Sequence, residues 1–126
     1  MSYKTLLVIK AAVCLGFGTL LLFLPVTLYK LFGALLTPPG VYAAREYGAA
    51  MIGILLLTWF GREIVDPVGR RAILLLVLVY DAIGFIVSLM AVLAGVLNPL
   101  GWSIVLLYLF LALGAAYVLR GEPQRV

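Results

Sequence analysis

Histidine is absent from this sequence, and cysteine is nearly so. The 126 residues include no histidine and a single cysteine, Cys14. The chain therefore lacks the commonest metal ligand, the usual axial ligand of haem and the usual general base near neutral pH. It also contains no Gly-rich phosphate loop, no G-x-S-x-G motif and no H-E-x-x-H motif. We expect no metal site, no cofactor and no enzymatic activity.

Charged residues are scarce as well. They make up 11% of the chain, and hydrophobic residues make up 66%, against roughly 25% and roughly 45–50% in soluble domains. A soluble protein of this size could not bury so much apolar surface, so the composition indicates an integral membrane protein. The net charge of +4 does not indicate a nucleic-acid partner, because the cations flank the apolar runs, where membrane topology places them.

Four apolar runs occupy most of the sequence, at residues 5–24, 41–61, 72–97 and 101–119. Each approaches or exceeds the roughly 20 residues that a helix needs to cross a bilayer. None alternates with a period of two, which argues against the strands of a membrane barrel. The sequence therefore predicts an all-α integral membrane four-helix bundle, formed as a single transmembrane domain by residues 1–126. The short loops predict that consecutive helices are antiparallel neighbours.

A less regular segment, PVTLYKLFGALLT at residues 25–37, lies between the first two runs. Pro25 suits the first turn of a new helix or a kink in the preceding one. Tyr29, Lys30 and Phe32 have the mixed character of an interfacial segment. We expect a short helix at the membrane surface; the alternative is that helix one continues, tilted, to Gly33.

The distribution of cations predicts the orientation. If both termini are cytoplasmic, that side holds six cations: Lys4, Arg62, Arg70, Arg71, Arg120 and Arg125. The opposite side holds only Lys30 and Arg45. This asymmetry matches the positive-inside rule, so we expect both termini on the cytoplasmic side of the inner or plasma membrane.

Two charges lie deep within predicted spans, Asp81 in the third and Lys10 in the first. Charges inside a membrane are costly and are functional candidates for that reason. At the rise of an α-helix, Asp81 lies roughly 14 Å and Lys10 about 8 Å from the cytoplasmic face, so the flexible lysine could reach the carboxylate. The pair could handle protons or cations; otherwise it is structural, or Asp81 is protonated and bonded to a tyrosine or serine.

Arg45 and Glu46 open the second run, in the stretch AAREYGAAMIG. Adjacent helical positions do not face one another, so each needs its own partner. Glu46 could pair with Lys30, and Arg45 could bind a lipid phosphate or another anionic ligand. These three residues are candidates for a lipid- or ligand-binding site; a pair that only fixes topology is the alternative.

Small and aromatic residues suggest packing and anchoring. Ala49 with Gly53, and Ala91 with Gly95, have the small-xxx-small spacing that lets helices approach closely. We favour packing within one chain over dimerisation for these pairs. Six aromatic residues cluster toward the span ends and are typical of an interfacial belt: Tyr42, Tyr47, Trp59, Phe60, Trp102 and Tyr117.

Several segments resemble known membrane proteins. Residues 31–33 (LFG), 44–57 (AREYGAAMIGILLL) and 97–119 (LNPLGWSIVLLYLFLALGAAYVL) are similar to small bacterial four-helix membrane proteins of unassigned function. The layout resembles the DoxX-like group, in which a surface segment follows helix one and an Arg–Glu pair opens helix two. This resemblance implies a four-helix bundle in the bacterial inner membrane and assigns no activity. Cation-driven exporters of similar length carry a glutamate in the middle of helix one. This chain has AAVCLGFG there, with no acidic residue, which argues against that family.

Two functions are open on this evidence. The first is a non-catalytic accessory or interaction subunit of a larger membrane assembly, or a lipid-associated protein. Its partners would be membrane lipids, other membrane-protein subunits or further copies of the chain. The second is a small-molecule or proton-coupled transporter that acts through Asp81 and Lys10. Four helices are few for a monomeric carrier, so a transporter would act as an oligomer. The lack of motifs favours the first.

Overall fold

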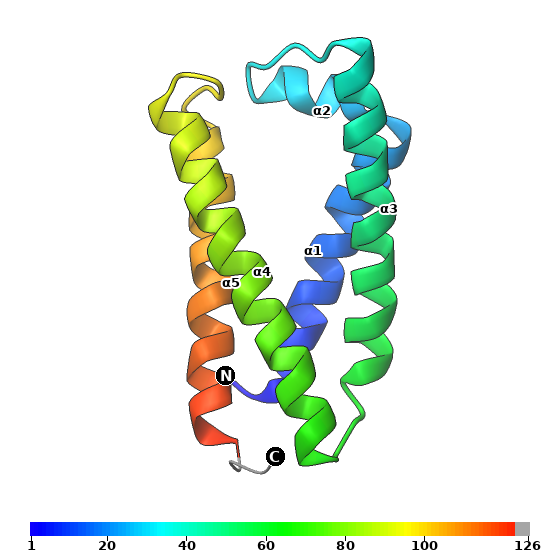
Figure 1. Cartoon of the computed structure of the whole chain (residues 1–126), viewed down its shortest axis with the longest axis vertical. Coiled ribbons are helices and arrows are strands. Elements are labelled where there is room, and N and C mark those ends of the chain that lie inside the picture. The colour runs from blue at the N-terminus through cyan, green and yellow to red at the C-terminus, as the bar shows by residue number, and fades with distance from the viewer. Residues whose placement is uncertain (123–126) are drawn as a thin grey trace.

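Helices account for nearly all of the fold (Figure 1). The computed structural model describes residues 1–122, in which five α-helices occur: α1 (Tyr3–Phe23), α2 (Pro25–Leu31), α3 (Pro38–Gly61), α4 (Pro67–Leu93) and α5 (Gly101–Gly121). All but α2 are long and apolar enough to cross a membrane, and no strand occurs in the described range. The predicted four-helix membrane architecture is confirmed, and the protein is a small multi-pass membrane protein.

The long helices α3 and α4 begin earlier than the apolar runs do. Each opens with proline in its first turn, where the missing N–H costs nothing. The side chain of Thr37 accepts a hydrogen bond from the Gly40 N–H, and that of Asp66 accepts one from the Gly69 N–H. These N-caps satisfy backbone donors that a helix otherwise leaves unpaired. The helices therefore begin before the predicted spans at residues 41 and 72, because their first turns hold the proline and glycine residues that precede the apolar runs.

The segment after α1 forms a separate helix. The sequence favoured this arrangement over a continuation of helix one. Leu24 leaves helical geometry, with φ −135° and ψ 51°, and α2 starts at Pro25. The helix is shorter than the predicted segment, since α2 ends at Leu31 and residues 34–37 carry no helix. In Figure 1, α2 runs across the end of α1 and α3 rather than along them.

The four long helices form two pairs. α1 packs along α3, and α4 packs along α5, whereas contacts between the pairs are few. Glycines bring α1 and α3 together: a β-carbon on Gly48 would lie 3.0 Å from the Gly18 carbonyl oxygen. The two pairs converge at one end and diverge toward α2 (Figure 1). The fold is a bundle that is closed at one end and splayed at the other.

The predicted packing pairs are not those that the fold uses. A β-carbon at Gly53 or Gly95 would meet nothing within 4 Å, and Ala49 is exposed. The prediction that these pairs pack within the chain is therefore wrong for Ala49 with Gly53. Gly95 instead ends α4 with a φ of 79°, a left-handed conformation that favours glycine after a helix, so α4 stops before residue 97.

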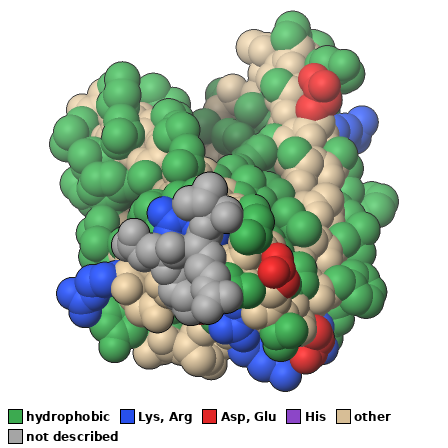
Figure 2. Space-filling view, turned by 60° about the horizontal axis from the view of Figure 1, so that its bottom comes forward, with side chains coloured by type: hydrophobic (Ala, Val, Ile, Leu, Met, Phe, Trp, Pro, Cys, Tyr) green, Lys and Arg blue, Asp and Glu red, His purple; other side chains and the backbone are tan. Residues whose placement is uncertain are grey.

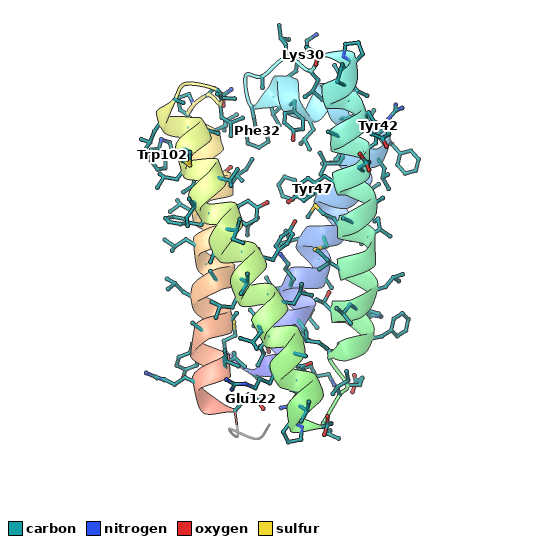
Figure 3. All side chains as sticks on the ribbon, viewed as in Figure 1. Lys30, Phe32, Tyr42, Tyr47, Trp102 and Glu122 are labelled. Atoms are coloured by element: carbon teal, nitrogen blue, oxygen red, sulfur yellow. The ribbon has the colours of Figure 1, made fainter. Side chains whose placement is uncertain are left out.

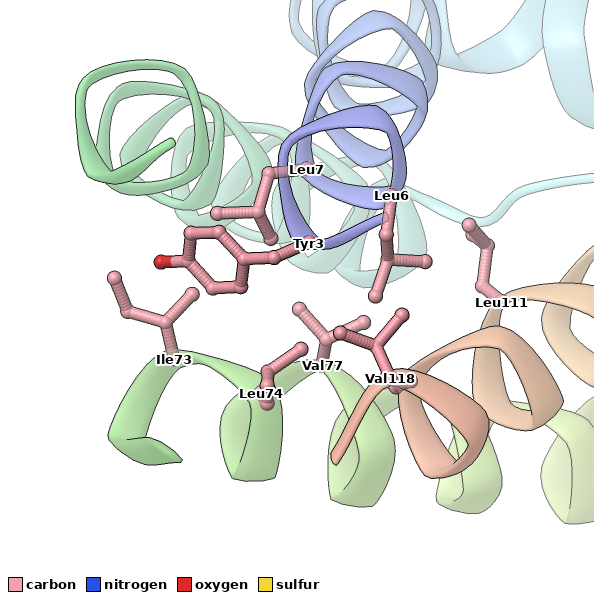
Figure 4. Packing of buried hydrophobic residues seen from close by; sticks show 9 residues of the cluster. Tyr3, Leu6, Leu7, Ile73, Leu74, Val77, Leu111 and Val118 are labelled. Carbon is pink, nitrogen blue, oxygen red and sulfur yellow. The ribbon is translucent and has the colours of Figure 1, made fainter. Parts of the chain in front are cut away.

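A buried apolar cluster holds the closed end together (Figure 4). Side chains from three helices meet in it: Tyr3, Leu6, Leu7, Ile73, Leu74, Val77, Leu111, Ala115 and Val118. The Tyr3 hydroxyl also donates a hydrogen bond to the Gly61 carbonyl oxygen at 2.8 Å. These contacts join α1 to α3, α4 and α5, so the closed end is the anchor against which the helix pairs spread.

The closed end carries most of the described charges, and we call it the basic end. Its cations are Lys4, Arg62, Arg70, Arg71 and Arg120; Arg125 lies outside the described residues. Lys4 and Arg62 pair with Glu63 at 3.1 and 3.5 Å, and Arg70 pairs with Glu122 at 3.2 Å. Figure 2, with this end turned forward, shows several of the charged side chains gathered toward the lower edge, among hydrophobic side chains and backbone.

The opposite end, which we call the α2 end, is joined by the loop after α4. The Asn98 backbone N–H donates to the Phe32 carbonyl oxygen at 2.8 Å. Its side-chain amide donates to the Leu31 carbonyl oxygen at 3.0 Å. Since Leu31 closes α2 and Asn98 follows α4, these two bonds connect the helix pairs a second time. The space between the pairs is thus bounded at both ends.

Candidate functional site

A buried ion pair joins the two helix pairs near mid-length. Lys10 Nζ on α1 lies 2.7 Å from Asp81 Oδ1 on α4, with side chains 2% and 0% exposed. Asp81 lies near the middle of α4, about 21 Å from its start at the rise of an α-helix. Of the partners considered for Asp81, the structure shows Lys10. The ionic contact compensates two charges that would otherwise be expensive inside a membrane.

The Asp81 carboxylate is only half satisfied. Oδ1 accepts from Lys10, but Oδ2 is buried and has no hydrogen-bond partner among the described residues. A buried acceptor without a partner costs free energy, and native structures rarely contain one. The second oxygen therefore marks a place where a hydrogen-bond donor from outside the chain would be stabilised.

Three tyrosines from three helices form a hydrogen-bonded set beside the ion pair, which we call the tyrosine row. The Tyr80 hydroxyl on α4 donates to the Tyr47 hydroxyl on α3 at 2.5 Å, and the Tyr47 and Tyr108 hydroxyls lie 2.6 Å apart. Lys10 Nζ lies 4.1 Å from the centroid of the Tyr80 ring, a cation–π distance. The tyrosine row links α3 to α4 and α5, and α3 otherwise makes few contacts with these two helices.

A glycine makes room for this arrangement on α4. A β-carbon at Gly84 would overlap the ring of Tyr108, so only glycine lets that ring lie against the α4 backbone. Four residues further along, the Ser88 hydroxyl donates to the Gly84 carbonyl oxygen at 2.7 Å and is thereby satisfied within its own helix. One face of α4 thus presents Tyr80, Asp81 and Ser88 toward the space between the pairs.

That space contains a cavity of about 490 Å³. Its walls are mainly apolar and come from all five helices, including Phe17, Leu28, Met51 and Leu107. The ion pair and the tyrosine row line the same cavity, and Lys10 and Asp81 are the charged residues in its lining. Figure 3 shows Tyr47 and Phe32 directed into the region between the helix pairs. The cavity is therefore largely apolar, with its polar groups on one wall.

The cavity is open to the side of the molecule. Ile83 and Val87 line it although they are 56% and 60% exposed. In a chain whose outer surface faces lipid, residues of this kind place the opening toward the bilayer. Tyr29 on α2 also lines the cavity, and burial raises the pKa of its hydroxyl above the usual value. The side opening suits molecules that are already dissolved in lipid.

Lys30, Arg45 and Glu46 do not come together. All three are exposed, and none forms an ion pair within residues 1–122. The contact between Lys30 and Glu46 that the sequence allowed is not present, because α2 crosses the end of the bundle and carries Lys30 outward (Figure 3). None of the three lines the cavity. Their surface positions remain compatible with lipid headgroups, which stays a prediction.

The tyrosine row is the part of the site that sequence reasoning missed. Tyr47 was assigned to the interfacial belt, which is wrong because it points into the cavity, whereas Tyr42 and Trp102 point outward (Figure 3). Tyr80 and Tyr108 were not singled out. The available signal was Tyr80 next to Asp81, together with tyrosines near mid-span, where an interfacial role does not apply.

The described residues contain no group of three metal-ligating side chains. Comparison with models of protein families, with curated proteins and with solved structures finds no match to this chain. The resemblance to DoxX-like proteins therefore stays a prediction. What the site can do must be argued from its own chemistry: a lipid-accessible apolar chamber whose polar wall consists of one ion pair and three tyrosines.

Proposed function

We propose that this protein binds an amphipathic, lipid-soluble small molecule in the cavity between its helix pairs. The apolar body of the molecule would lie among the aliphatic and aromatic walls, and its polar head would reach Asp81 and the tyrosine row. The observation that carries the proposal is the half-satisfied ion pair in the lining of the cavity. Largely apolar pockets of roughly 300–1,000 Å³ with a few convergent polar groups are typical ligand sites.

This role is non-catalytic and draws on the second of the two functions considered above, since it uses Asp81 and Lys10. Binding is the step that any carrier of such a molecule requires. The cation distribution further supports an orientation with both termini and the basic end on the cytoplasmic side of the cell membrane. An accessory role beside larger subunits is the competing proposal, and it predicts no small molecule in the cavity.

The test is chemical analysis of the protein purified in mild detergent. An organic extract of the wild type is compared by mass spectrometry with extracts of Ala91→Phe, which fills the cavity, and Ala50→Phe. Ala91 lines the cavity, whereas Ala50 is exposed on α3 and does not. We expect a small molecule to co-purify with the wild type and Ala50→Phe and to be lost from Ala91→Phe. Identical extracts from all three proteins would contradict the proposal.

A further inference from the structure

One hydroxyl proton of the tyrosine row takes part in no hydrogen bond within the row. Its three hydroxyls carry three protons, and two of these are used in the Tyr80–Tyr47 and Tyr47–Tyr108 hydrogen bonds. Whichever of Tyr47 and Tyr108 donates to the other, the remaining proton belongs to one of these two residues. Neither hydroxyl has a further partner within residues 1–122. The polar wall therefore offers one free tyrosine donor.

The same wall offers one free acceptor, Asp81 Oδ2. Because the Asp81 side chain is fully buried, bulk water does not satisfy this oxygen, and a ligand head reaches it only when neighbouring side chains shift. Asp81, Tyr47 and Tyr108 line the same cavity, so a ligand group that both donates and accepts matches the two unsatisfied positions. A hydroxyl group does this with a single atom.

Charge balance excludes charged head groups. Lys10 and Asp81 are the charged residues in the cavity lining, and their charges cancel. A carboxylate, a phosphate or a quaternary ammonium would add one uncompensated charge in a low-dielectric site, at a large desolvation cost. A neutral head adds none.

We infer that the ligand is a neutral lipid-soluble alcohol or phenol, whose hydroxyl donates to Asp81 Oδ2 and accepts from the free tyrosine of the row. This inference rests on the proposed ligand-binding function. The selecting residues are Asp81, which requires a donor, and Tyr47 or Tyr108, which requires an acceptor. An ether of the same shape accepts but cannot donate, so it leaves the carboxylate oxygen unpaired.

Three photoreactive probes test the head-group preference on the wild-type protein in lipid nanodiscs. Each carries a diazirine on the same medium-length alkyl chain, and the heads are a hydroxyl, a methyl ether and a carboxylate. Peptide mass spectrometry measures labelling at Leu107, which lines the cavity, relative to Leu106, which faces outward. The ratio corrects for differences in how the probes partition into the bilayer. We expect it to be about tenfold higher for the hydroxyl probe than for the other two, the effect of one hydrogen bond to a charged group.

The double variant Lys10→Met/Asp81→Leu separates this inference from the function on which it rests. It removes the ion pair without leaving a lone charge, and the cavity should still accept alkyl chains. In this variant we expect the hydroxyl and ether probes to label Leu107 equally. Equal labelling by these probes in the wild type, or stronger labelling by the carboxylate, would overturn the inference and leave the ligand cavity standing. No enrichment at Leu107 for any probe would overturn the proposed function itself.

Discussion

At the scale of single residues, Lys10 and Asp81 define the chemistry of this protein. Both are buried in helices that cross the membrane, where the energy of an unpaired charge is high. Their contact offsets the cost of burying two charges. It adds little net stability, because well-packed apolar residues can often replace a buried ion pair without loss. The position of this pair in the cavity wall supports the proposed ligand site.

The first prediction concerns this pair. Asp81→Leu leaves the Lys10 ammonium buried without its counter-ion, and we expect it to lower the free energy of unfolding by about 3–5 kcal/mol. The double variant Lys10→Met/Asp81→Leu should recover to within about 1 kcal/mol of the wild type, since no lone charge remains. Denaturant titration in detergent measures both. If the double variant were as unstable as the single one, the loss would have another cause than the unpaired charge.

The second prediction concerns the tyrosine row. Tyr80→Phe keeps the ring beside Lys10 but removes the donor to Tyr47, and we expect it to cost about 1 kcal/mol of stability. Tyr42→Phe is the matched control, because Tyr42 is exposed and makes no side-chain hydrogen bond within residues 1–122. Thermal unfolding in detergent compares the two. Equal melting temperatures for both variants would show that the hydrogen bond contributes nothing.

At the scale of helices, the sequence predicts the elements well and their neighbours poorly. Long apolar runs suffice to locate α1, α3, α4 and α5, and Pro25 correctly separates α2 from α1. The packing faces were harder to predict, because a helix that is apolar on all sides has no hydrophobic stripe that identifies the face in contact with its neighbour. Gly48 packs on α1 whereas Gly53, only five positions away, meets open space; nothing in their local sequence distinguishes them.

The third prediction uses these two glycines as a matched pair on α3. Gly48→Val places a branched side chain against the Gly18 carbonyl and Leu21, and we expect overpacking to cost about 1–3 kcal/mol. Gly53→Val enters open space and should change stability by less than about 0.5 kcal/mol. The free energy of unfolding in detergent measures both effects. Comparable losses in both variants would mean that backbone conformation, rather than the α1–α3 contact, determines the cost.

At the scale of the whole molecule, two helix pairs are joined at both ends and enclose a cavity whose polar wall links them near mid-length. The apolar cluster joins the helix pairs at the basic end, and the hydrogen bonds of Asn98 join them at the α2 end. Of the candidate site, the depth of Lys10 and Asp81 in their spans made their contact one of the open alternatives, and the structure shows it. The cavity and the tyrosine row could not be predicted in this way, because they depend on how far the pairs diverge, which reflects contacts between residues distant in sequence.

The fourth prediction concerns the lipid surroundings on which the cavity's side opening depends. If α3 crosses the bilayer, residues that flank its two ends must lie on opposite sides. Leu35 and Val65 are 80% and 82% exposed, whereas the native Cys14 is buried and should not react. Leu35→Cys and Val65→Cys therefore report the two ends of α3 separately.

Labelling with a membrane-impermeant maleimide tests this claim directly in intact cells. We predict that Leu35→Cys reacts at once and that Val65→Cys reacts only after the membrane is permeabilised, with the wild type as the unreactive control. Reaction of both cysteines in intact cells would place both ends of α3 on the same side and would contradict the four-span structure.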